Sequence, residues 1–123
     1  MAPSDLLPTQ LRRGVLEFCV LALLAQHESY GFDLVRRLSA TSDGLVTTEG
    51  TIYPLLSRLR RDGWVATTWH ESEKGPPRRY YCLTRQGAIA LKNFEVEWDK
   101  FTAAVDSLLH QKGLHEPRND PGG

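Results

Sequence analysis

The sequence has little cysteine, no excess of either charge and no long apolar run, and each scarcity excludes a class of protein. Two cysteines, Cys19 and Cys82, cannot make the dense disulfide framework of a small secreted domain, so a reducing cytoplasm is the expected compartment. The longest apolar stretch, residues 15–25, is interrupted by Glu17 and is too short to span a bilayer. Because the N-terminus also has no cationic segment followed by an apolar run, neither export nor membrane anchoring is expected.

Patterns typical of catalysis and metal binding are missing from the sequence as well. We find no nucleophile–base pair, no phosphate-binding loop and no carboxylate pair in a supporting context, so an enzyme is not expected. The histidines show no paired spacing with cysteines or acids, and each is interpreted as a surface residue: His27, His70, His110 and His115. We therefore predict no metal and no cofactor.

The chain is long enough, at 123 residues, for one domain with a real core plus an appendage. Its formal net charge is zero, so a surface for an anionic partner has to come from the local distribution of charge. Residues 51–85 carry seven Lys or Arg and three Asp or Glu, a local excess of four cations. This region is the candidate for such a surface.

The N-terminal half of the chain predicts two helices after a flexible lead-in over residues 1–9. Residues 10–27 form a helix that is apolar nearly all round, so it must be buried on more than one side, and a second chain is expected to cover part of it. A shorter helix follows from Phe32 to about Ala40, with Arg36 and Arg37 facing outward. The T-S-D-G segment at 41–44 has the composition of a turn.

A third helix is predicted over residues 48–62, with Thr48 as the N-cap and Gly63 just past its end. Four apolar residues share the i, i+3, i+4, i+7 spacing that gathers side chains on one inward face: Ile52, Leu55, Leu56 and Leu59. The opposite face is small, hydroxylated and cationic: Pro54, Ser57, Arg58 and Arg61, with Thr51 and Tyr53 at its margins. Pro54 lies beyond the first turn, so we expect a bend or a tight first turn.

The pattern then changes to two strands, at 64–69 and 78–83, which are rich in aromatic and β-branched residues. We expect residues 70–77 to form a long tip between them, because Pro76 and Pro77 lack ladder donors. Such a hairpin, or wing, carries Lys74 at its tip and Arg78 and Arg79 at its returning base.

A long helix is predicted over residues 84–112, capped by Thr84, and a disordered tail over 113–123. Its apolar residues alternate in steps of three and four, as in the narrow seam of a coiled coil: Leu91, Phe94, Trp98, Phe101, Val105 and Leu108. The helix is longer than the three-helix body can cover, so we expect this seam to meet a second copy of the chain. Trp98 is either a packing residue of that interface or the wall of a pore for a planar ligand.

Three short helices followed by a wing match the winged helix-turn-helix arrangement, which reads DNA with its third helix. Hydroxyls and arginines supply base-edge and phosphate contacts. The alternative is that the polar face of helix 48–62 is only a solvated surface, and the adjoining basic wing favours the DNA reading. Tyr80 and Tyr81 point to opposite faces of their strand, so one should pack inward while the other can approach DNA.

Several segments together resemble the PadR family of winged helix-turn-helix regulators: L-R-R-G-V-L-E-F-C-V-L-A-L-L (11–24), S-Y-G-F-D-L (29–34), E-G-T-I-Y-P-L-L-S-R-L (49–59), D-G-W-V (62–65), G-P-P-R-R-Y-Y-C-L-T (75–84) and Gly87. The resemblance covers residues 10–110. It implies a dimeric transcriptional regulator, usually a repressor, with the third helix in the major groove and the wing at the flanking backbone or minor groove. The family's motifs fall on Gly50, Thr51, Tyr53 and Pro54, and on Gly75, Arg78, Tyr80 and Tyr81.

We therefore predict a mainly α (α+β) fold: a winged helix-turn-helix over 10–83 and a single C-terminal dimerisation helix over 84–112, as in the smaller members of the family. The homodimer should bind double-stranded DNA at an inverted repeat, with half-sites about 34–36 Å apart or a multiple of that. The expected DNA contacts are Thr51, Tyr53, Pro54, Ser57, Arg58, Arg61, Lys74, Arg78 and Arg79. A protein-interaction scaffold that does not bind DNA is the alternative, and Trp98 is the candidate site for a small aromatic effector.

Overall fold

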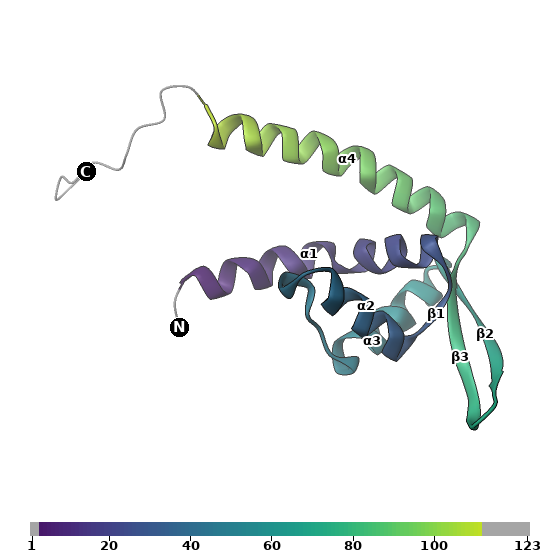
Figure 1. Ribbon diagram of the computed structural model, residues 1–123. Coiled ribbons are helices and arrows are strands. Elements are labelled where there is room, and N and C mark those ends of the chain that lie inside the picture. Colours follow the sequence, from purple (N-terminus) through teal and green to yellow (C-terminus); the bar gives the residue numbers. More distant parts are fainter. Residues whose placement is uncertain (1–2, 112–123) are drawn as a thin grey trace. The chain divides into compact units, whose positions relative to one another are not determined.

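Three helices pack together in the first part of the chain, and a small sheet extends from them as a hairpin (Figure 1). This computed structural model describes the backbone of residues 3–111, and the side chains of residues 15–111. The elements in chain order are α1 (Pro3–Gln26), β1 (Ser29–Tyr30), α2 (Gly31–Thr41), a 3₁₀ turn η1 (Asp43–Leu45), α3 (Glu49–Arg61), β2 (Val65–Ser72), β3 (Gly75–Leu83) and α4 (Arg85–Leu109). This is the predicted mainly helical fold with a wing and a long last helix.

The chain divides into two compact units, with the boundary in the sequence after Lys92. The first unit holds α1 to β3 and the beginning of α4, and the second holds the rest of α4. Among the described residues, none of the helices is both long enough and apolar enough to cross a lipid bilayer.

The core of the first unit is built from α1, α2 and α3 and from the sheet. The four apolar residues predicted to face inward on α3 are all buried, as the i, i+3, i+4, i+7 spacing requires. They pack against leucines and a valine of α1, two leucines of α2 and two residues of the sheet: Leu16, Val20, Leu21, Leu24, Leu34, Leu38, Val65 and Tyr81.

The first helix starts earlier than predicted, at Pro3 rather than at residue 9 or 10, so a flexible lead-in over residues 3–9 is wrong. Proline at the first helical position costs no hydrogen bond, because that N–H has no partner within a helix. From residue 15 onward α1 buries Leu16, Val20, Leu21 and Leu24 in its own unit, and the half-buried Phe18 tilts against Trp64 with 6.0 Å between ring centroids. Val15, Cys19 and Leu23 are only half-buried in the single chain, so the cover of this helix by a second chain stays a prediction.

Arg37 was predicted to face outward, and this prediction is wrong. Its side chain instead holds α1 and α2 together. Its guanidinium donates to the carbonyl of Leu23 at 3.0 Å, to the Gln26 side chain at 3.2 Å and to the buried Ser29 hydroxyl at 2.5 Å. The carbonyls at the C-terminal end of α1 lack partners within the helix, so a cation there is favourable. Arg36, by contrast, is exposed as expected.

The sheet has three strands in the order β1-β3-β2, and the edge strand β1 was not predicted. It consists of Ser29 and Tyr30, which pair antiparallel with Tyr81 and Tyr80. Two residues are too few to show the alternation by which strands are recognised in a sequence. This short strand leads directly into α2 and so places the start of α2 beside the wing.

The third helix has the predicted signals at both ends. Thr48 occupies the N-cap position without a side-chain capping bond, and its carbonyl accepts from the N–H groups of Thr51 at 3.1 Å and Ile52 at 3.0 Å, which makes a tight first turn. The helix then continues through Pro54. Gly63, with φ at +81°, ends it in a Schellman motif, in which Trp64 N–H donates to Leu59 at 3.0 Å.

The wing is a longer hairpin with a shorter tip than predicted, so the loop assigned to residues 70–77 is wrong. The strands extend to Ser72 and from Gly75, which leaves Glu73 and Lys74 as the turn. The prolines are tolerated in β3 because the pairing skips from Ser72–Gly75 to His70–Arg78, and because β1 occupies the other edge of β3 only at Tyr80 and Tyr81.

The junction between the wing and α4 is held by Thr84. Its hydroxyl accepts from the Gly87 N–H at 3.0 Å, which confirms the predicted helix cap, and it donates to the Gly63 carbonyl at 2.6 Å. The helix α4 ends at Leu109, three residues short of the predicted end. The predicted disordered tail lies outside the described residues.

Candidate nucleic-acid interface

The face of α3 opposite the core is polar and exposed along its whole length. All six side chains predicted for that face are exposed: Thr51, Tyr53, Pro54, Ser57, Arg58 and Arg61. At about 100° per residue, Pro54, Ser57 and Arg61 lie along the middle of this face, while Tyr53 and Arg58 lie on its opposite margins. The two margins meet different neighbours.

Tyr53 lies on the margin that faces α2. Its ring covers the backbone of Gly31, and an added Cβ there would stand 2.5 Å from Tyr53 Cε1 and 2.8 Å from the hydroxyl oxygen. Burial, and to a smaller extent Glu49 and Tyr81, raise the pKa of the Tyr53 phenol above its usual range. The side chain is nevertheless 40% exposed, so it presents a neutral ring and hydroxyl to solvent.

Arg58 lies on the opposite margin and is engaged with α1. Its guanidinium donates to the Glu17 carboxylate at 3.0 Å, and the two side chains are both partly exposed. The bridge ties α3 to α1, and it directs the Arg58 charge away from the middle of the polar face. Arg61 carries the cation nearest that middle.

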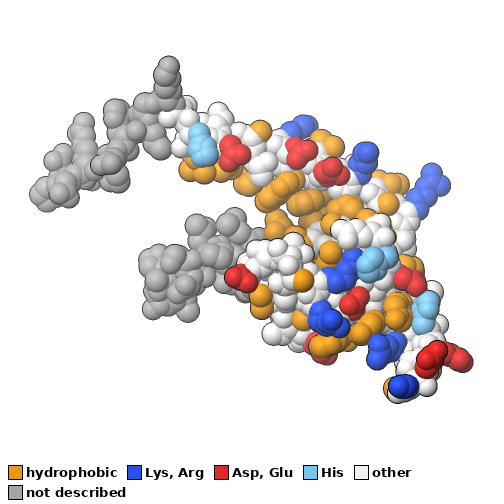
Figure 2. Space-filling model, viewed as in Figure 1, with side chains coloured by type: hydrophobic (Ala, Val, Ile, Leu, Met, Phe, Trp, Pro, Cys, Tyr) orange, Lys and Arg blue, Asp and Glu red, His pale blue; other side chains and the backbone are white. Residues whose placement is uncertain are grey.

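Arg78 and Arg79, adjacent in sequence, lie on opposite faces of the wing, because side chains alternate along a strand. Arg78 stacks over the ring of Tyr30, with Cζ 4.7 Å from the ring centroid. Arg79 stacks over Trp69, its partner across the sheet, with Cζ 4.9 Å from the centroid. Lys74 lies in the turn next to Glu73, and Figure 2 shows basic and acidic side chains together at the wing tip.

The structure shows which of Tyr80 and Tyr81 packs inward, a choice that the sequence left open. Tyr81 packs into the core and is 6% exposed. Tyr80 lies on the other face of the sheet, where its ring meets Tyr30 edge-on at 5.5 Å and lies 4.3 Å from the ring of His70, between centroids. The half-buried Tyr80 therefore faces the outer side of the wing.

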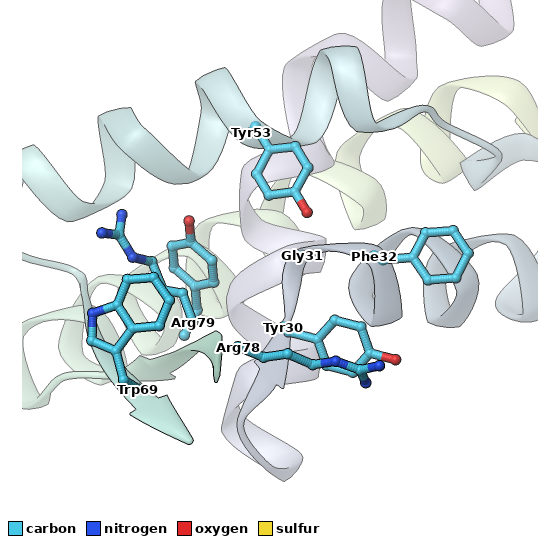
Figure 3. Close-up of a pocket in the computed structure, with 8 residues that line it drawn as sticks. Tyr30, Gly31, Phe32, Tyr53, Trp69, Arg78 and Arg79 are labelled. Atoms are coloured by element: carbon cyan, nitrogen blue, oxygen red, sulfur yellow. The ribbon is translucent and has the colours of Figure 1, made fainter. Parts of the chain in front are cut away.

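A hollow of about 620 Å³ lies between α3, the start of α2 and the wing. We call it the wing groove and define it by its lining residues: Tyr30, Gly31, Phe32, Tyr53, Trp69, Arg78, Arg79 and Tyr81. Figure 3 shows Tyr53 on one side and Arg78, lying along Tyr30, on the other, with Trp69 and Arg79 beside them. Five aromatic rings and two guanidinium groups line the groove, and none of its lining residues carries a carboxylate.

Tyr30, Phe32 and Trp69 also contribute to this surface, which the sequence pattern did not predict. Trp69 is 64% exposed although it lies in a strand, and Phe32 is 45% exposed at the start of α2. The alternation of β2 places Trp69 on the same face as the buried Val65, but the core ends before it reaches Trp69. The alternation of side chains along β2 could be predicted from the sequence, but the residue at which the core ends could not.

The predicted seam of α4 falls mostly in the second unit. Leu91 is the exception, since it packs against the core of the first unit. Farther along, Trp98 is 39%, Phe101 61% and Leu108 64% exposed, whereas Phe94 and Val105 are half-buried. The rings of Phe94 and Trp98 stack at 5.7 Å, and Phe101 follows at 6.4 Å from Trp98.

A family model and solved structures that match this chain give the same family. A model of the transcriptional regulator PadR-like family matches residues 20–93. The structure of a PadR family transcriptional regulator from Eggerthella lenta is similar with a TM-score of 0.78 and 32% identity, over 89% of this chain and 94% of that one. A PadR-like regulator from Bacillus cereus has a TM-score of 0.76 and 35% identity, over 84% and 99%. An uncharacterized protein of Lysinibacillus sphaericus is 26% identical over 93% of this chain and 99% of its own length.

Proposed function

This chain belongs to the PadR-like family of transcriptional regulators, and from that premise we propose that it is a homodimeric repressor that binds double-stranded DNA. One observation carries the proposal: α3 buries a wholly apolar face and exposes a face of hydroxyls and arginines, with the basic wing next in the chain. Helix-turn-helix proteins place such a helix in the major groove.

Each exposed residue of α3 has a proposed role. Thr51 and Ser57 are small hydroxyl donors suited to base edges, and Pro54 gives an apolar contact between them. Arg61 binds a phosphate, because it is exposed near the middle of the face. Arg58 binds a second phosphate after DNA displaces Glu17 from it. Breaking this bridge costs little, because an exposed ion pair contributes only about 0–1 kcal/mol.

The wing supplies the remaining predicted contacts. Lys74, Arg78 and Arg79 are exposed and are proposed to bind the phosphates that flank the major groove. Tyr53 stands on the margin of α3 that faces α2 and the wing groove, where its neutral hydroxyl can donate to the backbone of the DNA. These contacts position the protein and carry no sequence information.

The seam of α4 is proposed to form the subunit interface. Large apolar side chains on one stripe are well exposed in the single chain, and aromatic residues dominate the stripe. A two-fold axis at this seam would present two copies of α3 to an inverted repeat, with half-sites one helical turn apart or a multiple of it.

The ring series of Phe94, Trp98 and Phe101 favours a second role for this seam, the stacking of a planar aromatic effector. Titrating planar compounds while following tryptophan fluorescence and release of DNA tests this role. Unchanged DNA affinity at saturating compound would remove the effector and leave packing as the function of Trp98.

Selection of bound sequences from a random DNA library tests the proposed function, and inverted-repeat sequences are expected. The double variant Arg58→Glu, Arg61→Glu should lose affinity for the selected DNA while it remains a folded dimer by sedimentation. If wild type enriches no sequence, or the double variant binds as wild type does, the alternative of a protein-interaction scaffold takes its place.

A further inference from the structure

The wing groove contains more aromatic surface than phosphate binding requires. Its walls are rings from β1, α2, α3 and the wing, and the ring of Trp69 is mostly exposed. Contiguous apolar surface rimmed by polar groups often marks a binding site, and the groove has the size of a small-ligand site. The groove therefore points to a partner with both apolar and anionic parts.

The two arginines of the groove are already oriented by the aromatic rings. Arg79 lies over Trp69 at 4.9 Å and Arg78 over Tyr30 at 4.7 Å. A guanidinium stacked on a ring keeps its N–H donors at the edge of the stack, so it can bind an oxyanion without leaving the ring. Since the arginines lie on opposite faces of β3, they approach the groove from two sides.

We infer that the wing groove seats one strand of the DNA backbone, with a deoxyribose packed against the indole of Trp69 and the phosphates on either side of it bound by Arg79 and Arg78. This inference rests on the proposed function and assigns Trp69 a contact that neither the sequence nor the family comparison gives. The absence of any carboxylate among the lining residues fits an anionic occupant.

The consequence is a part of the DNA affinity that does not depend on salt. Phosphate contacts release counterions, so each contributes about −0.9 to the slope of log K against log salt concentration. A sugar packed on an indole releases none, and it contributes to the affinity that remains on extrapolation to 1 M salt. A modest local excess of cations can thus be supplemented by apolar contact.

The experiment measures affinity against salt for wild type, Trp69→Ala, Trp69→Phe and Arg79→Gln, on a selected operator and on random DNA. Trp69→Ala should lower the extrapolated affinity of the dimer about a hundredfold at an unchanged slope, from the loss of one aromatic contact in each subunit. Trp69→Phe, which keeps a flat apolar ring, should stay within about tenfold of wild type. Arg79→Gln should reduce the slope by about two, one phosphate in each subunit.

The matched control for apolar truncation is Val96→Ala, because Val96 is 47% exposed on α4 and lies off the predicted seam. In protein labelled with 5-fluorotryptophan, DNA should shift the resonance of Trp69 and leave that of Trp64, which packs against Phe18. The Trp69→Phe variant assigns the signal.

Two results would overturn the inference while the proposed function survives. In the first, wild type binds DNA but Trp69→Ala matches it in slope and extrapolated affinity. In the second, Trp69→Ala changes the ratio of operator to random affinity by more than about tenfold, which would make Trp69 a base reader. If wild type binds neither DNA, the proposed function and the inference fall together.

Discussion

The ring of Tyr53 lies over the α-carbon of Gly31, so α3, the proposed recognition helix, and the start of α2 touch at a point where there is no room for a side chain. Tyr53 also lines the wing groove, together with residues of the wing. One aromatic ring thus sets the spacing between the three parts of the proposed DNA-binding surface.

Gly31→Ala should therefore displace Tyr53 and weaken DNA binding. The new methyl group would stand 2.5–2.8 Å from three atoms of the ring, which must rotate toward solvent or push α3 away. We expect about a tenfold loss of affinity, and a loss of stability within the 1–3 kcal/mol typical of overpacking. Anisotropy titration and urea unfolding measure the two effects.

The control is Gly44→Ala, since an added Cβ at Gly44 would meet only the Ser42 hydroxyl at 3.6 Å. It should bind DNA as wild type does. If Gly31→Ala also retained full affinity, the spacing set by Tyr53 would not matter for binding.

Arg58 and Arg61 of α3 should differ in their effect on DNA binding. Arg61→Gln should weaken binding of operator and random DNA alike and reduce the salt slope. Arg58→Gln should have the smaller effect, because the bridge to Glu17 must first break. Both affinities are measured by fluorescence anisotropy under the same conditions. Equal losses of DNA affinity in the two variants would show that the bridge to Glu17 does not limit the contribution of Arg58.

Removing the Arg37 guanidinium should destabilise the fold without touching the DNA surface. Arg37→Met keeps the apolar stem but leaves the buried Ser29 hydroxyl and the Leu23 carbonyl without this donor. The expected loss is about 2 kcal/mol of unfolding free energy, measured by urea denaturation. Arg36→Met is the matched control, because Arg36 is exposed on the same helix, and a loss of equal size there would contradict the assignment.

Gly87 should tolerate no larger residue. A Cβ at this position would collide with the Trp64 carbonyl oxygen and lie 2.8 Å from Leu83 Cδ1, where the wing passes into α4. Gly87→Ala should cost about 1–3 kcal/mol or more in thermal and urea unfolding. Gly75→Ala, with 3.5 Å to the Ser72 hydroxyl, serves for comparison and should be nearly neutral.

The sequence predicted those parts of the fold that depend on periodicity and local signals. The buried stripe of α3, Gly63 at its end and the cap at Thr84 were all readable, because each acts within a few residues. The two-residue strand at Ser29 and the inward orientation of the Arg37 side chain could not be predicted, because both depend on partners distant in the chain.

The wing shows the same limit. Two prolines correctly indicate that a ladder donor is missing, but only the pairing register shows that the donor is not needed there. The sequence likewise predicted the cations of the candidate surface, yet not that Arg58 is held by Glu17, or that Trp69 and Tyr30 support the arginines of the wing.

The central claim is that two copies of α3 and the wing bind the DNA backbone through basic side chains. Affinity for a selected operator, measured between 50 and 200 mM salt, tests it most directly. A dimer making about 6–10 phosphate contacts should lose about 10³–10⁵ in affinity over this range. Affinity that does not change with salt, or that is the same for the Arg61→Glu, Arg79→Glu variant, would contradict the claim.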